Sequence, residues 1–110
     1  MKIIYIAHPI SGDIEGNLNK IVEIARHINL TLPNVTPIAP YFLDCHALND
    51  DIPEERQRGI TNDSEFFIRR IMDEVWLYGD KISNGMKQEI RQARAMNIPV
   101  ISKSEGTKAF

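Results

Sequence analysis

Lys2 to Ala7 reads KIIYIA, a short and almost uninterrupted apolar run that is rich in β-branched side chains. Such a run is typical of a strand that is covered on both faces, as in a parallel sheet. The next residues, His8 to Asp13, break the pattern, because proline and glycine favour turns and no apolar period continues. The sequence therefore predicts a buried first strand followed by a loop.

Further strand-like runs follow, and helical patterns separate them. From about Glu15 to Leu30, apolar residues recur at the spacing of one helix face, which predicts an amphipathic helix. Other helices are expected from Thr61 or Asn62 through Met72 and after Ser83-Asn84-Gly85. The expected strands are Val35 to Ala39, with Pro37 typical of an edge, Glu74 to Tyr78 (EVWLY) and Ile98 to Ser102 (IPVIS).

This alternation of strands and helices predicts the fold class. Strands that are separated by helices need right-handed crossovers into a parallel sheet. We therefore expect an α/β, flavodoxin-like (Rossmann-like) three-layer sandwich whose parallel sheet has about four strands in the order 2-1-3-4. Tyr5, Trp76 and Tyr78 are most simply core residues. The other expected core residues are Ile4, Ile6, Ile21, Ala25, Val75, Leu77, Ile90, Ala93 and Val100.

The length of 110 residues suits one hydrophobic core, so a single domain is expected over residues 1–110. Within it, residues 40–59 are mixed and acidic and show no sustained apolar stripe. Because a loop longer than about 12–15 residues is usually functional or mobile, a lid-like segment with room for one short helical turn is expected there. Residues 103–110 are expected to form a loose tail.

Composition and charge exclude several classes of function. A net charge of -2 provides no broad basic field, so binding to a nucleic acid polymer is disfavoured. The first apolar run is far too short for a signal sequence or a membrane span, and Cys45 has no partner for an internal disulfide, so a cytoplasmic protein is expected. Cys45 and His46 are too few ligands for a metal site, and neither a metal nor another cofactor is expected.

In an open parallel sheet, ligands bind beyond the carboxyl ends of the strands, where the strand order reverses. Strands one and three are expected to flank that point. The loops at residues 8–13 and 79–85 should converge there, and the second loop leads into the helix that carries Glu89.

Several motifs of the chain occur together in a recognisable order. They are His8-Pro9-Ile10-Ser11-Gly12, Asn17, Asp73-Glu74-Val75-Trp76, Ser83-Asn84-Gly85-Met86-Lys87-Gln88-Glu89-Ile90 and Ala93. Together they resemble the nucleoside 2-deoxyribosyltransferase-like superfamily, although Arg91 departs from the family pattern, which usually has glycine there. The resemblance implies that Glu89 is the nucleophile that attacks the anomeric carbon of a deoxyribose, where a carboxylate can stabilise or trap an oxocarbenium-like sugar, and that Gly85 lets the substrate approach the helix. It also implies an acidic residue on the preceding helix that assists the departing base, and both Asp63 and Glu65 fit this role.

The sequence thus predicts an enzyme that hydrolyses or transfers at the N-glycosidic bond of a nucleoside or nucleotide. A non-catalytic sensor or sponge that binds a nucleotide-derived ligand in the same cleft is the alternative, and an interaction protein with a vestigial cleft is a third reading. A homodimer or larger homo-oligomer is expected, in contact through the apolar helix at residues 60–72. The expected substrate-binding residues are His8, Ile10, Ser11, Gly12, Asp73, Ser83, Gly85 and Met86.

Overall fold

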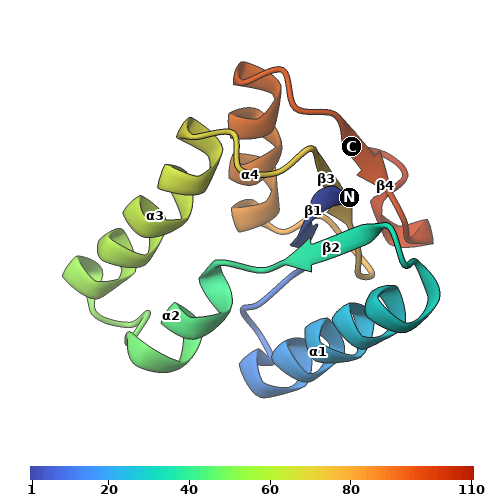
Figure 1. Cartoon of the computed structure of the whole chain (residues 1–110). Helices are drawn as coiled ribbons and strands as arrows, with labels where there is room; N and C mark the ends of the chain where they lie inside the picture. Colours follow the sequence, from blue (N-terminus) through green and yellow to red (C-terminus); the bar gives the residue numbers. More distant parts are fainter.

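A computed structural model, which describes all 110 residues, shows a four-stranded parallel sheet with helices on both faces (Figure 1). All three strand pairs are parallel, and the strand order is β2-β1-β3-β4. The flavodoxin-like fold class and the strand order 2-1-3-4 are therefore confirmed. The strands are β1 (Lys2–Ala7), β2 (Val35–Ile38), β3 (Glu74–Leu77) and β4 (Val100–Ser102).

Four helices connect and cover these strands. Two of them begin at side-chain caps: Asp13 accepts a hydrogen bond from the Gly16 amide, and Ser83 accepts one from the Met86 amide. None of the helices combines the length and the apolar composition that crossing a membrane requires. The helices are α1 (Ile14–Thr31), α2 (Tyr41–Ala47), α3 (Pro53–Ile68) and α4 (Asn84–Ala95), and a 3₁₀ turn, η1, spans Glu105–Thr107.

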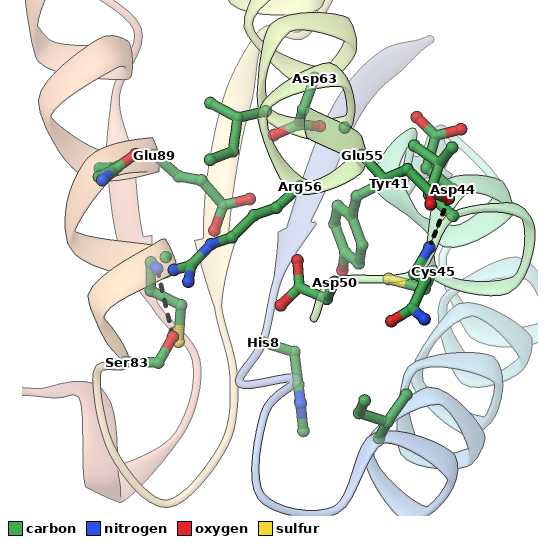
Figure 2. Close-up of a pocket in the computed structure, with 18 of the residues that line it drawn as sticks. His8, Tyr41, Asp44, Cys45, Asp50, Glu55, Arg56, Asp63, Ser83 and Glu89 are labelled. Carbon is green, nitrogen blue, oxygen red and sulfur yellow. Dashed lines mark hydrogen bonds between the residues drawn. The ribbon is translucent and has the colours of Figure 1, made fainter. Parts of the chain in front are cut away.

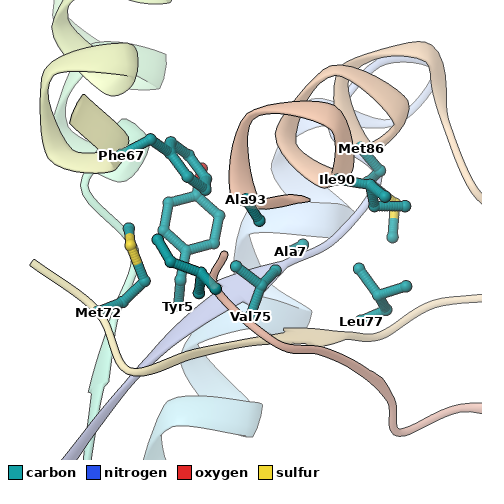
Figure 3. Close-up of a cluster of buried hydrophobic side chains, with 10 residues drawn as sticks. Tyr5, Ala7, Phe67, Met72, Val75, Leu77, Met86, Ile90 and Ala93 are labelled. Atoms are coloured by element: carbon teal, nitrogen blue, oxygen red, sulfur yellow. The ribbon is translucent and has the colours of Figure 1, made fainter. Parts of the chain in front are cut away.

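The sheet separates two hydrophobic cores, because successive side chains of a strand point to opposite faces. Tyr5 and Ala7 of β1 face α3 and α4, where Phe67 and Met86 join them (Figure 3). Ile4 and Ile6 face α1 on the other side. The expected core is confirmed for Ile4, Ile6, Ile21, Val75, Leu77, Ile90 and Ala93, whereas Ala25 and Val100 are only partly buried.

Residues 40–59 are not the lid-like loop that the sequence predicts. Most of them are helical, in α2 and in the first turns of α3. Pro53 stands in the first turn of α3, where its missing N–H costs nothing, and Glu54 and Glu55 complement the helix dipole. The helix expected from Thr61 or Asn62 through Met72 is present, but its bounds are wrong: α3 begins at Pro53 and ends at Ile68, and Arg70 has a φ of 52°.

The end of the chain is not a loose tail. Thr107 is fully buried, and its hydroxyl donates a hydrogen bond of 2.9 Å to the Ser104 carbonyl. Gly106 packs so tightly on the loop after β3 that a Cβ there would collide with the Asp80 backbone. Residues 104–107 are therefore a fixed part of the fold, and they lie against the loop that leads into α4.

Candidate active site

A cavity of about 450 Å³ opens beyond the carboxyl ends of β1 and β3 (Figure 2). Its walls come from the loop after β1, from α2 and α3, and from the start of α4. This is the place where the strand order reverses, and the volume lies in the range of about 300–1,000 Å³ that small-molecule sites occupy. We call it the acidic cavity, for the six carboxyl groups that line it: Asp44, Asp50, Asp51, Glu55, Asp63 and Glu89.

Two of these carboxyl groups meet on one buried hydroxyl. Tyr5 lies in β1 between Phe67 and Tyr41, with its ring centroid 4.9 Å from that of Phe67. Its hydroxyl lies 2.7 Å from Asp63 Oδ2, on α3, and is also hydrogen-bonded to Glu89 Oε2, on α4. The packing of two helices over one tyrosine thus brings together carboxyl groups that are distant in the sequence.

The hydrogen bonds of Tyr5 fix the protonation of this carboxyl pair. A phenol has one proton to donate, so it cannot donate to two carboxylates at once. One of the two carboxyl groups must itself hold a proton and donate it to the Tyr5 oxygen. Asp63 and Glu89 therefore hold at least one proton between them in this arrangement.

Burial also favours the protonated form of both carboxyl groups. Loss of solvent raises the pKa of Asp63 from 3.8 to about 6, and it raises the pKa of Glu89 well above its usual value, with repulsion from Asp63 adding to the rise. The Tyr5 hydroxyl opposes both shifts. Asp63 Oδ1 is buried without a hydrogen-bond partner, so a ligand that donated a hydrogen bond to it would remove the free-energy cost of burying an unpaired oxygen.

The opposite side of the acidic cavity holds a histidine with a defined tautomer. His8 is buried, and its Nδ1 lies 2.7 Å from the Pro9 carbonyl oxygen. Since a carbonyl can only accept, Nδ1 carries the proton and Nε2 is the acceptor of the neutral ring. His8 can therefore accept a hydrogen bond from a hydroxyl of a ligand.

The start of α4 leaves room for a ligand. Gly85 lines the acidic cavity, and a Cβ placed there would meet nothing closer than Ser83 Oγ at 3.9 Å. Its φ is not in the left-handed region, so neither packing nor backbone geometry requires glycine at this position. The space that the missing side chain leaves belongs to the cavity.

The structure separates some expected site residues from the acidic cavity. Glu65 points to solvent on α3 and pairs with Arg69 at 2.9 Å, so it does not reach the cavity. Asp73 precedes β3, at the amino-terminal ends of the strands and therefore away from the cavity. Its carboxylate accepts a hydrogen bond of 2.8 Å from the Ile3 amide. The sequence spacing did not show that Glu65 lies on the solvent side of α3, or that Asp73 lies at the amino-terminal end of β3, away from the cavity.

Only part of the loop after β1 reaches the acidic cavity. His8 lines the acidic cavity, whereas Ile10, Ser11 and Gly12 do not. Asn17 holds this loop from α1, because its side-chain amide donates a hydrogen bond of 2.9 Å to the Ile10 carbonyl. Of the expected site residues, the structure gathers His8, Asp63, Ser83, Gly85, Met86 and Glu89 around the cavity.

Sequence reasoning missed the contribution of α2 and of the loop after it. Tyr41 lines the acidic cavity and donates a hydrogen bond of 2.6 Å to the Ile6 carbonyl. Cys45 lines it too, but burial, with Asp50 and Asp44 nearby, raises the pKa of its thiol to about 11, so it is not a thiolate at neutral pH. No group of three or more His, Cys, Asp and Glu side chains is placed to hold a metal ion.

The hydroxyl of Tyr5 was the signal in the sequence that could have indicated its place in the site. A buried tyrosine hydroxyl nearly always needs a hydrogen-bond partner, so a tyrosine within an otherwise aliphatic strand predicts a polar group on a facing element. The sequence analysis assigned Tyr5 only to the core. The structure shows that its ring is core and that its hydroxyl belongs to the site.

Fold and site together define a flavodoxin-like α/β protein with a carboxyl-lined cavity at its strand ends. The chain matches the family described as Domain of unknown function (DUF7768) over residues 2–103, and it belongs to that family. No curated protein and no solved structure matches the chain.

Proposed function

We propose that this protein cleaves the N-glycosidic bond of a nucleoside or nucleotide, by hydrolysis or by transfer of the sugar to a second base. The observation that carries the proposal is the meeting of Glu89 and Asp63 on the Tyr5 hydroxyl at the wall of the acidic cavity. The resemblance of the surrounding motifs to the nucleoside 2-deoxyribosyltransferase-like superfamily supports it.

The shared proton gives the two carboxyl groups different roles. When the proton is on Asp63, Tyr5 donates its own proton to Glu89, whose carboxylate is then free to attack an anomeric carbon. A bond forms between Glu89 and the sugar, the C–N bond breaks, and its electron pair leaves with the base. Asp63 supplies the proton that the departing base needs, and water or a second base then displaces Glu89.

Asp63, and not Glu65, is our choice for the acid. Asp63 lines the acidic cavity, and burial raises its pKa to about 6, which suits a group that donates a proton near neutral pH. Glu65 is exposed and paired with Arg69 outside the cavity. The positions of the two residues therefore support Asp63 as the proposed acid.

The charge of the acidic cavity favours a substrate without a phosphate. Six carboxyl groups line it, and Arg56, which extends into it from α3, is the only lysine or arginine among the lining residues (Figure 2). A 5′-phosphate carries about −1.5 to −2 charges near neutral pH and would be repelled by the carboxylates. Within the proposed class, a nucleoside is the preferred substrate over its monophosphate.

A binding-only protein is the second candidate, and one observation favours it. Burial keeps a proton on the Glu89 carboxyl to higher pH than usual, and a neutral carboxyl is a hydrogen-bond donor instead of a nucleophile. Such a site would hold a neutral, nucleotide-derived ligand without cleaving it. The two candidates use the same cavity and differ in the need for an ionised Glu89.

Release of free base, measured by liquid chromatography on a panel of nucleosides and their 5′-monophosphates, tests the proposal. Glu89→Gln should lower the rate more than about a hundredfold, a loss of about 3 kcal/mol of transition-state stabilisation. Glu65→Gln is the matched control, because it makes the same change on the exposed side of α3.

Equal rates for the parent and Glu89→Gln would remove Glu89 from the mechanism. A parent that releases no base from any member of the panel, yet binds one member tightly, would establish the binding-only function.

A further inference from the structure

A second cavity, of about 490 Å³, lies against α4 and the end of the chain. Four cationic side chains line it, Lys81, Lys87, Arg91 and Arg94, and Asp80 is its only acidic residue. Ile90 and Phe110 contribute apolar surface. We call it the basic cavity, since its charge is opposite to that of the acidic cavity.

The sequence of α4 places the two cavities on opposite sides of this helix. Gly85, Gln88, Glu89 and Gln92 line the acidic cavity, with the spacing of one helix stripe. Lys87, Ile90, Arg91 and Arg94 line the basic cavity with the same spacing, shifted by two residues. At about 100° per residue, a shift of two residues turns the helix by about 200°. One helix therefore presents Glu89, flanked by two glutamines, to one cavity and a cationic stripe to the other.

The four cations of the basic cavity outnumber its single acidic residue, Asp80. None of them forms an ion pair; the ion pairs of this protein involve Lys2, Arg69 and Lys108. In a chain of net charge -2, four unpaired cations around one hollow create a local positive potential. An anion with several charged oxygens is the ligand that would neutralise them.

The apolar surface of the basic cavity includes an aromatic ring. Phe110 is partly exposed, and the Arg94 guanidinium lies 5.6 Å from its ring centroid. The segment that brings it there is anchored, because Thr107 is buried and Gly106 packs on the Asp80 backbone. A flat heterocycle can stack on such a ring while charged groups of the same ligand reach the cations.

We propose that the basic cavity binds a nucleoside di- or triphosphate, with its base against Phe110 and its phosphates on Lys81, Lys87, Arg91 and Arg94. The volume suits one small ligand, and the cations line a single open hollow instead of forming the long stripe that a nucleic acid polymer needs. The proposal is independent of catalysis at Glu89.

Isothermal titration calorimetry with ATP tests this site, with tripolyphosphate, adenosine and a single-stranded oligonucleotide as comparison probes. ATP should bind at one site, more tightly than tripolyphosphate or adenosine, and more weakly as salt rises. The double variant Arg91→Gln/Arg94→Gln should weaken ATP binding about tenfold or more, because it removes charge-assisted hydrogen bonds. Lys20→Gln/Arg26→Gln, which removes two exposed cations of α1, should leave it unchanged.

Glu89→Gln should retain ATP binding, so that a failure of the proposed catalysis and a failure of this site give different results. Both arginines are exposed, and an unchanged melting curve will verify that the double variant is folded. Absence of ATP binding, or equal affinity in the parent and the double variant, would overturn the proposal. If tripolyphosphate bound as tightly as ATP, stacking of the base on Phe110 would be contradicted. If the oligonucleotide bound more tightly than ATP, the ligand would be a nucleic acid polymer and the proposal of a small ligand would be wrong.

Discussion

Tyr5→Phe removes one oxygen atom from the centre of the carboxyl pair and leaves the packed ring in place. The lost hydroxyl makes one hydrogen bond to an ionised carboxylate, worth about 1.5–3 kcal/mol, and one to a neutral carboxyl, worth about 0.5–1.5 kcal/mol. The free energy of unfolding should therefore fall by about 2–4 kcal/mol. Because the hydroxyl lowers the pKa of both carboxyl groups, its loss should raise the pKa of Glu89 further.

The consequence for activity depends on pH. Below its pKa, each unit by which the pKa of Glu89 rises reduces the ionised fraction about tenfold, so base release should fall at neutral pH and recover in part at alkaline pH. The measurements are denaturant unfolding and kcat/KM for base release between about pH 5 and 9. Tyr78→Phe is the matched control, because Tyr78 is half-buried outside the acidic cavity. Parent-like stability and an unshifted pH profile in Tyr5→Phe would refute the role of the bridging hydroxyl.

Three further predictions follow from the cavity, the carboxyl pair and the surface. Gly85→Ala should raise the free energy of unfolding by about 0.5–1 kcal/mol, as alanine does within a helix, while weakening substrate binding; calorimetry and KM measure the two effects, and an unchanged KM would show that no ligand approaches Gly85. Because the pKa values of Asp63 and Glu89 are raised, the contribution of this pair to stability is greatest below their ordinary pKa near 4 and is lost as the pH rises through the folded values, about 6 for Asp63. The melting temperature of Glu89→Gln relative to the parent should therefore increase from pH 4 to pH 8, and a constant difference would contradict this. Phe66 and Ile68, in the last turn of α3, and Ile71, just beyond it, are 37%, 62% and 42% exposed, and we propose that they form a homo-oligomer contact. Light scattering should show an assembly that Ile68→Asp dissociates, and a monomeric parent would contradict the proposal.

The fold was readable from the sequence because its signals are local and agree with one another. The alternation within KIIYIA separates Ile4 and Ile6 from Tyr5 and Ala7, and each pair lies in a different core. The apolar stripe of α1 and the serine cap of α4 are equally local. Crossover handedness then leaves few topologies for such a set of elements.

Residues 40–59 were wrongly predicted as a loop because proline and acidic residues are common both in loops and at the start of helices. Proline and acidic residues interrupt an apolar period, but they also stand in the first turn of many helices, and in α3 they do so at Pro53, Glu54 and Glu55. The convergence of Asp63 and Glu89 was not readable either, since it depends on how α3 and α4 pack over Tyr5. Spacing within one segment carries no information on such a contact.

The carboxyl pair is costly to the fold, and this cost bears on function. Burial raises the pKa of both carboxyl groups, and Asp63 adds to the rise at Glu89, which means that ionising either one destabilises the folded state. The surrounding core would pack without them, because Phe67, Met86 and Ile90 already cover Tyr5 and Ala7. A chain that places two carboxyl groups and an unpartnered Asp63 oxygen at the wall of a ligand-sized cavity gives up stability there. Perturbed carboxyl groups in a cavity mark a functional site more often than a structural one, and the pair on Tyr5 is the place where this protein's chemistry should be tested first.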